Sequence, residues 1–255
     1  MKLYLDVTIA NQYKSTPQKT RVFTENWVNQ EIFCPACGAD IIKFENNRPA
    51  ADFYCEECKE EYELKSKRNI IGNKIVDGAY QTTIERLESH NNPNLFLLNY
   101  NPKNYEITNF FVVPKYFFIP EIIEKRNPLS ATARRAGWTG CNILLSGIPQ
   151  SGKIFYIDNH LLVPKEQVLQ SWQKTLFLKK EGETHRKTWI IDIMNCVEKL
   201  KKKEFALKEM YAFIDFLQVK HPGNHHVKDK IRQQLQYLRD KGYLEFSGNG
   251  KYRML

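Results

Sequence analysis

Three residues that lie close together in the sequence have the types that a metal-dependent hydrolase needs. Asp52 is separated by ten residues from the sequence Glu63-Leu64-Lys65. On an extended strand Glu63 and Lys65 project to the same face, because side chains alternate, and Asp52 can reach that face from a neighbouring strand. The carboxylates of Asp52 and Glu63, with the backbone carbonyl of Leu64, are ligands that suit Mg²⁺. The pattern predicts metal-assisted hydrolysis, with Lys65 orienting the attacking water or stabilising negative charge.

The same three residues also have an ordinary explanation. Asp and Glu-x-Lys occur by chance on solvated hairpins of a chain in which 26% of the residues are charged. Their position favours a site, because the cysteines Cys55 and Cys58 lie between Asp52 and Glu63. A metal ion held by these cysteines would fix the hairpin that carries both carboxylates.

Four of the six cysteines form two Cys-x-x-Cys pairs, Cys34 with Cys37 and Cys55 with Cys58. This spacing is typical of a four-cysteine zinc site, in which each pair supplies two thiolates to a tetrahedral ion. The alternative is two unrelated pairs or a redox motif. Four thiolates saturate the ion, so we expect a structural Zn²⁺ with no open catalytic position.

The elements that must position these residues follow from apolar periodicity and from turn residues. Ser15-Thr16-Pro17-Gln18 predicts the start of a helix that continues through Trp27, and residues 77–88 have the spacing of a second helix. Short apolar runs between turns predict strands at residues 51–54, 62–65, 95–100, 110–113 and 154–157, with a loop at Asn46–Pro49 and turns throughout residues 120–152. The fold class is therefore α/β, with a mixed sheet flanked by helices.

A second domain is predicted at the C-terminal end. The polar stretch 179–187 has the composition of a linker, which gives domains at residues 1–183 and 184–255. Helices are predicted at 189–200, 207–219 and 227–241, followed by strands at 243–246 and 251–255 around a glycine-rich turn. Three helices followed by a hairpin are typical of a winged helix.

Two segments carry side chains suited to DNA. The helix at 227–241 would be the recognition helix, and the loop before Gly140 has two arginines beside an indole. The candidates are Lys228, Lys230, Arg232, Gln233, Gln234 and Gln236 on the helix, Lys251 and Arg253 on the wing, and Arg134, Arg135 and Trp138 in the loop. The alternatives are a solvated helix in a protein-binding domain and a core tryptophan beside surface arginines.

Composition limits the partners. A formal net charge of +9 at pH 7 and a pI of about 9.1 favour polyanions, because neutralised phosphates release their counterions. We expect no membrane partner and no small-molecule substrate. With no signal peptide evident at the N-terminus, a cytoplasmic location and a monomer are our expectations.

Several runs of the sequence resemble the DpnI family of methyl-directed (type IIM) restriction endonucleases, which belongs to the PD-(D/E)xK superfamily. The resemblance spans essentially the whole chain. It is carried by residues 44–49, 51–55, 63–67, 77–80, 132–138 and 230–236. The sequence departs from the superfamily pattern at Ala51, where a proline usually precedes the aspartate, and from the family at residues 11–20, in the linker and at residues 220–226.

The resemblance implies a restriction-endonuclease-like domain with an inserted zinc ribbon, followed by a winged helix. It implies cleavage of double-stranded DNA at GATC sites that contain N6-methyladenine, with both domains binding methylated DNA. Asp52, Glu63 and Lys65 take the catalytic roles, and the four cysteines bind zinc. The competing hypotheses are a regulator that binds DNA without cutting it and a repair or structure-specific nuclease.

Overall fold

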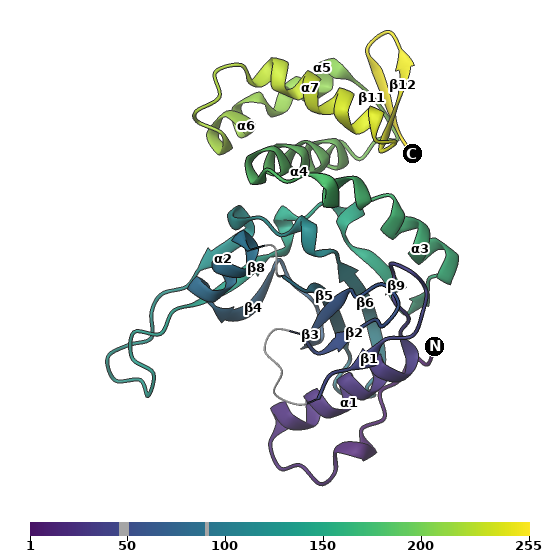
Figure 1. Cartoon of the computed structure of the whole chain (residues 1–255), viewed down its shortest axis with the longest axis vertical. Helices are drawn as coiled ribbons and strands as arrows, with labels where there is room; N and C mark the ends of the chain where they lie inside the picture. The colour runs from purple at the N-terminus through teal and green to yellow at the C-terminus, as the bar shows by residue number, and fades with distance from the viewer. Residues whose placement is uncertain (46–50, 90–91) are drawn as a thin grey trace. The chain divides into compact units, whose positions relative to one another are not determined.

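The computed structural model describes residues 1–45, 51–89 and 92–255, which form two compact units (Figure 1). Unit 1 comprises residues 1–146 and 151–173, and unit 2 comprises residues 147–150 and 174–255. The loop expected at Asn46–Pro49 lies outside the described residues. Residues 174–183 pack within unit 2, and the domain boundary expected after residue 183 stays a prediction.

A seven-stranded mixed sheet forms the centre of unit 1. Its strands lie in the order β1-β2-β3-β5-β6-β9-β10, and β3 and β5 are parallel whereas the other neighbouring strands are antiparallel. The strands are β1 (Ile42–Lys43), β2 (Phe53–Tyr54), β3 (Glu61–Arg68), β5 (Asn94–Tyr100), β6 (Ile107–Val113), β9 (Ile154–Asp158) and β10 (Leu161–Leu162). Every residue of β5 is buried, as expected for a central strand covered on both faces. The predicted mixed sheet is confirmed.

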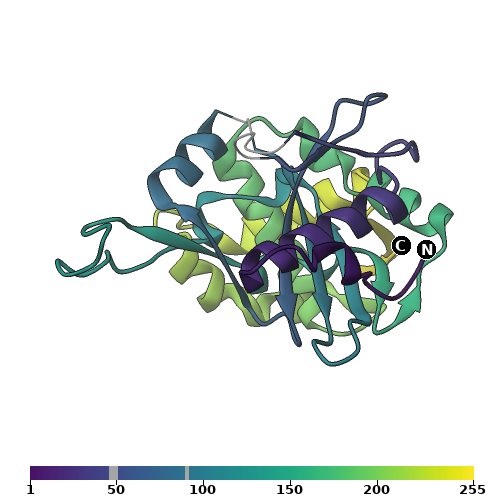
Figure 2. The same ribbon diagram turned by 90° about the horizontal axis from the view of Figure 1, so that it is seen from below.

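Helix α1 (Thr16–Glu31) lies across the strands of this sheet (Figure 2). The hydroxyl of Ser15 caps it by accepting a hydrogen bond from the Gln18 N–H, and a proline occupies the first turn, where its missing N–H costs nothing. The ring of Trp27 meets the edge of Phe110 on β6, with 5.2 Å between ring centroids. The helix entry predicted from the sequence is confirmed, and α1 is held against the sheet by its apolar face.

A second, three-stranded sheet contains β4 (Lys74–Ala79), β8 (Gly140–Leu144) and β7 (Ile123–Lys125), in that order. Helix α2 (Tyr80–Glu88) follows β4 directly, so the predicted helix starts three residues too early. Residues 77–79 are extended because they pair with β8, and this pairing overrides their helical spacing. The prediction of turns throughout 120–152 was also wrong, since β7 and β8 lie there and enclose a long loop at residues 126–139.

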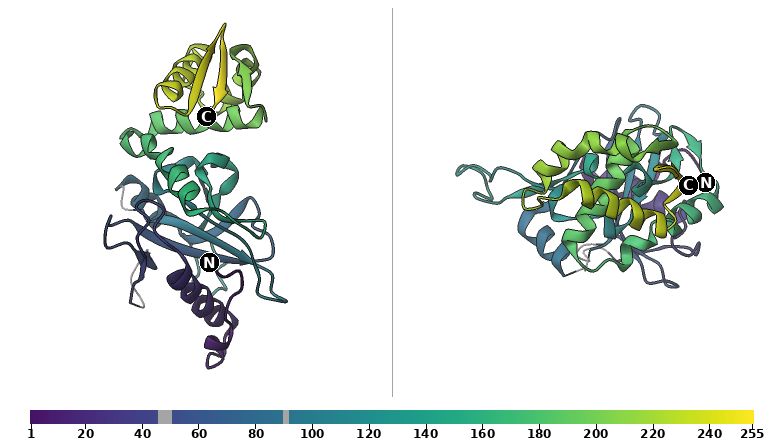
Figure 3. Two further views of the ribbon diagram at one scale, coloured as in Figure 1. Left: turned by 90° about the vertical axis from the view of Figure 1, so that its right-hand side faces the viewer. Right: turned by 90° about the horizontal axis from the view of Figure 1, so that it is seen from above.

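Unit 2 has winged-helix order (Figure 3). Four helices and a three-stranded antiparallel sheet in the order β11-β13-β12 make up most of it. The elements are α4 (Thr184–Lys199), β11 (Glu204–Ala206), α5 (Leu207–Met210), α6 (Ile214–Lys220), α7 (Val227–Asp240), β12 (Leu244–Gly248) and β13 (Lys251–Met254). The helix expected at 207–219 is divided by a 3₁₀ turn at Tyr211–Phe213, and β11 was not predicted.

The remaining elements are short or peripheral. They are α3 (Lys165–Gln173) and 3₁₀ turns at Thr8–Ala10, Lys115–Phe117, Pro120–Ile122, Leu145–Gly147, Gln150–Gly152 and Leu176–Lys180. Across the part of the chain that the structure describes, no helix has both the length and the apolarity needed to cross a membrane.

Phe96 on β5 provides a test of the core. Its side chain is 0% exposed, stacks on Tyr62 at 4.5 Å and contacts Phe110 at 5.2 Å, between ring centroids. We expect Phe96→Ala to lower the free energy of unfolding by about 3–5 kcal/mol, because a cavity replaces the ring. Urea titration followed by circular dichroism measures this. The control Ile70→Ala, at a side chain 82% exposed, should change it by less than about 0.5 kcal/mol; equal effects would contradict the assigned core.

Candidate active site and metal-binding cysteines

The residues predicted to hold a catalytic metal meet where β2 joins β3. The backbone N–H of Asp52 donates to the carbonyl of Tyr62 at 2.9 Å, which brings Asp52 beside the first half of β3. Oδ2 of Asp52 accepts a hydrogen bond from the N–H of Leu64 at 2.8 Å. Asp52, Glu63 and Leu64 line one cavity of about 550 Å³. The structure therefore brings these three residues together on one open surface.

Lys65 lies between two carboxylates. Its Nζ is 2.5 Å from Oε1 of Glu63 and 2.8 Å from Oδ1 of Asp77 on β4. Asp77 belongs to one of the runs that resemble the DpnI family, but the sequence alone does not predict it as a site residue. Asp77 lies on β4, the next strand after β3 in the chain, which could have suggested that it joins the site. The sequence of the turn between the two strands does not show which face of β3 Asp77 approaches.

Burial changes the titration of these groups. It raises the pKa of Asp52, which the hydrogen bond from Leu64 only partly offsets, and it raises the pKa of Glu63 despite the nearby charge of Lys65. Burial alone would lower the pKa of Lys65, but the charges of Glu63 and Asp77 raise it above its usual range. The carboxylates are thus desolvated more than they are compensated, which favours an added cation.

Two carboxylates and a carbonyl are hard oxygen donors of the kind that Mg²⁺ takes while it keeps several of its waters. Within residues 1–45, 51–89 and 92–255, only the four cysteines bring three or more His, Cys, Asp or Glu ligand atoms within 4.8 Å of one another. Asp52 and Glu63 therefore fit an ion that is completed by water and substrate, and they do not form a closed protein cage.

The sulfur atoms of the four cysteines converge on one point, as expected for a metal site. Cys34 lies 3.4 Å from Cys58 and Cys37 lies 3.5 Å from Cys55, measured between Sγ atoms. In a tetrahedral site with metal–sulfur bonds of about 2.3 Å, sulfur atoms are roughly 3.8 Å apart. The cysteines are positioned to bind a metal ion, and the remaining Cys141 and Cys196 are buried elsewhere, as expected.

The thiols have unequal environments. Burial raises the pKa of Cys34 and raises that of Cys58 to about 11. Burial would also raise the pKa of Cys55, but hydrogen bonds from backbone N–H groups and from Cys37 lower it overall. The hydroxyl of Tyr62 lies 3.0 Å from Sγ of Cys34, so β3 contacts the cluster directly. Buried thiols of raised pKa become thiolates only where a cation compensates them.

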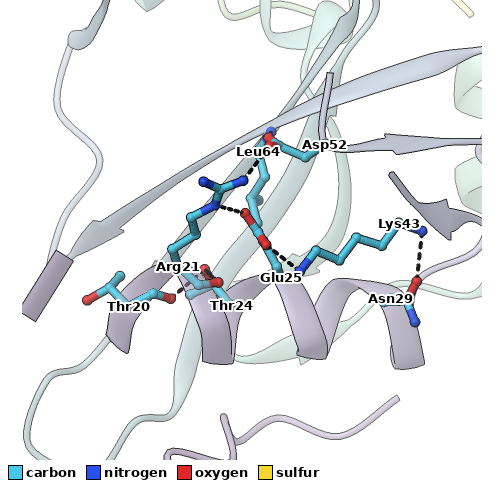
Figure 4. Close-up of polar contacts among 8 residues, drawn as sticks. All are labelled: Thr20, Arg21, Thr24, Glu25, Asn29, Lys43, Asp52 and Leu64. Atoms are coloured by element: carbon cyan, nitrogen blue, oxygen red, sulfur yellow. Dashed lines mark hydrogen bonds and ion pairs between the residues drawn. The ribbon is translucent and has the colours of Figure 1, made fainter. Parts of the chain in front are cut away.

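Helix α1 contributes a charged group that sequence reasoning missed (Figure 4). Glu25 is only 4% exposed, and its carboxylate pairs with Nε of Arg21 at 2.5 Å and with Nζ of Lys43 at 2.7 Å. Nη2 of Arg21 lies 3.9 Å from Oδ1 of Asp52. Arg21 and Glu25 both line the cavity beside Glu63. Their spacing of four residues on a helix is the signal that could have suggested the pair.

The candidate DNA-binding residues on α7 and the wing differ in their exposure to solvent. Gln234 is 2% exposed, so it cannot lie on the outer face predicted for it. Apolar Ile231, Leu235 and Leu238 share its buried side, which follows from helical spacing. Lys228, Arg232, Gln233, Gln236, Lys251 and Arg253 are exposed, and Lys230 is half-buried. Arg232 also donates to the hydroxyl of Tyr211 at 2.7 Å.

The loop candidates lie together between β7 and β8 (Figure 2). The guanidinium of Arg135 is 4.9 Å from the ring centroid of Trp138, and Arg134 and Arg135 are exposed. Trp138 is half-buried and lies over Gly140, where any Cβ would approach the indole to 2.7 Å. The ring is therefore supported from one side by the backbone and is not a core tryptophan.

Comparison with known protein families gives two adjacent matches. The model of the Dam-replacing family, DpnI, matches residues 1–181. The model of the Dam-replacing HTH domain, DpnI_C, matches residues 185–254. Together they cover nearly the whole chain.

The cysteine cluster predicts a metal content. We expect one divalent metal ion per chain in the purified protein, and none in a Cys34→Ser, Cys55→Ser double variant, because two thiolates bind an ion too weakly. Plasma mass spectrometry measures the ion. The matched control Cys141→Ala, Cys196→Ala should keep it. A double variant that retained the full metal content would contradict the assignment of these ligands.

Proposed function

This chain belongs to the Dam-replacing (DpnI) family, and on that premise we propose that it is a type II restriction endonuclease. It cuts double-stranded DNA at GATC sites that contain N6-methyladenine, by Mg²⁺-dependent hydrolysis of a phosphodiester. Family membership and the helix-turn-helix domain support a restriction-type function and DNA binding. The dependence on methylation and the GATC site come from the resemblance of the sequence to the family.

One observation carries the catalytic part of the proposal. Asp52 from the end of one strand and Glu63 from the next face a common cavity, while Lys65 is held between Glu63 and Asp77. Two half-buried acids and a cation in this order match what metal-assisted phosphodiester hydrolysis requires, whereas acids beside a bound phosphate would weaken binding in a protein that only binds DNA.

In the proposed mechanism Asp52, Glu63 and the carbonyl of Leu64 hold Mg²⁺. When bound, this ion would lower the pKa of a water and neutralise charge that develops on the phosphate. Lys65 keeps its proton at neutral pH and donates hydrogen bonds to the attacking water or to a phosphate oxygen. Asp77 positions Lys65 by accepting from its Nζ. Asp52 is oriented by the N–H of Leu64.

We assign DNA recognition to residues of both units. On α7 and the wing the exposed candidates Lys228, Arg232, Gln233, Gln236, Lys251 and Arg253 would contact phosphates and base edges. In the loop before β8, Arg134, Arg135 and Trp138 form a second contact surface. The ion held by the four cysteines is proposed to be structural Zn²⁺, and the protein to be a cytoplasmic monomer without a small-molecule substrate.

Two other functions share part of this structure. The basic face of α7 would serve equally a regulator that binds DNA and leaves it intact. A repair or structure-specific nuclease would share the chemistry at Asp52 and differ in substrate. Cleavage and methyl dependence separate the three.

Cleavage of a plasmid with GATC sites, prepared with and without adenine methylation, tests the proposal. With Mg²⁺ we expect the wild type to cut only the methylated plasmid. Asp52→Ala should cut it slower by a factor on the order of 10²–10³ or more, because charge stabilisation is lost, and should still bind it. Gel electrophoresis and a binding titration measure both. Intact methylated plasmid with wild-type protein would favour the regulator, and cutting of both plasmids would contradict methyl dependence.

The contact between Lys65 and Asp77 predicts a pH effect. Asp77 raises the pKa of Lys65, so Asp77→Asn should lower it, and the lysine should lose its proton at a lower pH. Activity that needs charged Lys65 should then fall at a lower pH in the variant than in the wild type. Single-turnover cleavage rates from pH 8 to 11 measure the alkaline limb, because the pKa of Lys65 lies above the ordinary lysine value. Thr83→Val, beside Asp77, serves as a control for packing; an identical limb in Asp77→Asn would contradict the positioning role.

A further inference from the structure

The cavity beside Asp52 extends well past the proposed metal ligands. From Glu63 and Leu64 it follows β3 to Ser66 and Arg68, and it is bounded on the other side by the first three turns of α1. A second cavity of about 280 Å³ shares Thr16, Thr20 and Arg68 with it and continues to Lys19. Because the two cavities share these three lining residues, we describe them together as one trough that leads away from the carboxylates.

Arg21 stands at the inner end of this trough. Glu25 fixes the guanidinium through Nε, and Lys43 pairs with the other oxygen of the same carboxylate. The three groups together carry one net positive charge. Arg21 is still 53% exposed, and its Nη2 faces Asp52 at 3.9 Å. Because a guanidinium has five N–H donors in a fixed fork, the donors that Glu25 leaves can bind an anion beside Asp52.

Arg68 stands at the outer end. Leu64, Ser66 and Arg68 project to one face of β3, because side chains alternate along a strand. Nε of Arg68 donates to the hydroxyl of Tyr100 at 3.3 Å, and that hydroxyl lies 3.5 Å from the hydroxyl of Thr20. Among the described residues, no carboxylate forms an ion pair with the guanidinium of Arg68. Arg68 is therefore oriented by neutral groups and keeps its full charge for a ligand.

We propose that Arg21 and Arg68 bind two different phosphates of the cleaved DNA strand, and that the trough between α1 and β3 holds this strand. Residues 64 and 68 are roughly 13 Å apart along an extended strand, whereas phosphates of one DNA strand are about 3.4 Å apart along the helix axis. One side chain can therefore not serve both positions. Arg21 contacts the scissile phosphate or its neighbour, and Arg68 contacts a phosphate further along the same strand.

The hydroxyls and charges along the trough fit a sugar-phosphate backbone. Thr16, Thr20 and Ser66 offer hydroxyl donors between the two guanidiniums. The acids that face it are Glu25, which is paired, and Asp52 and Glu63, whose charge the metal would neutralise. This inference rests on the proposed function, since it assigns the path of the strand that the active site would cut.

Salt dependence of binding distinguishes a phosphate contact from a structural role. Each phosphate neutralised in duplex DNA contributes about 0.9 to the slope of log K against log salt concentration. A methylated GATC duplex, titrated by fluorescence anisotropy without Mg²⁺ over a range of NaCl concentrations, gives this slope. We expect Arg21→Gln and Arg68→Ala each to reduce its magnitude by about 0.9, and the double variant by about 1.8.

Two controls make the result unambiguous. Lys103→Ala removes one positive charge at an exposed turn of the same unit and should leave the slope unchanged. Arg21→Lys keeps the charge, so it should restore the slope while the single-turnover cleavage rate stays reduced roughly 10-fold or more, since a bidentate contact is lost. Arg68→Ala changes an exposed side chain, so its folding is not at risk.

An unchanged slope in both Arg21→Gln and Arg68→Ala, with the wild-type slope reproduced by Lys103→Ala, would overturn the inference. A wild type that binds with the expected slope but does not cut with Mg²⁺ would instead contradict the proposed function. Failure of the inference and failure of the proposed function therefore give different experimental results. A reduced slope in Arg21→Gln alone would contradict the path along β3 to Arg68.

Discussion

The short hairpin between β2 and β3 is the constraint on which the rest of the site depends. β2 pairs with β3 through only two residue pairs, Phe53 with Tyr62 and Tyr54 with Glu61, which is too little to hold a strand by itself. Cys55 and Cys58 occupy the turn, where Lys59 has the positive φ of 60° that the tight bend requires. The thiols of Cys34 and Cys37 converge on the two thiols of this turn, and an ion bound by all four would hold β2, which starts directly after Asp52.

Charge balance explains why the same region should take both a metal and a phosphate. Among the described residues, the ion pairs around the cavity join four carboxylates, those of Glu25, Asp52, Glu63 and Asp77, to three cations, Arg21, Lys43 and Lys65. The network therefore carries one net negative charge. A divalent cation reverses its sign and makes the cavity attractive to a phosphate. A metal ion bound here would therefore strengthen phosphate binding at the cavity.

The features that could be predicted from the sequence depend on neighbouring residues or on a periodic pattern within one helix or strand. The two cysteine pairs, the helix entry at Ser15, the apolar strands and the winged-helix order all depend on residues a few positions apart, and the structure or the family matches confirm them. Errors arose where pairing with a distant segment decided the conformation. Residues 77–79 have helical spacing but join β8, and residues 123–125 become a strand by pairing with β8 (residues 140–144), which β4 and β7 flank on its two sides.

The same reasoning explains which parts of the site were missed. Alternation along β3 puts Glu63 and Lys65 on one face and Leu64, Ser66 and Arg68 on the other, and the sequence shows this much. It does not show which element covers each face. In the fold β4 brings Asp77 to the first face, and α1, about 40 residues upstream, brings Arg21 and Glu25 to the second. The residues of β3 to which we assign the chemistry are therefore visible in the sequence, whereas those that would hold the substrate against them become visible only when the helix is in place.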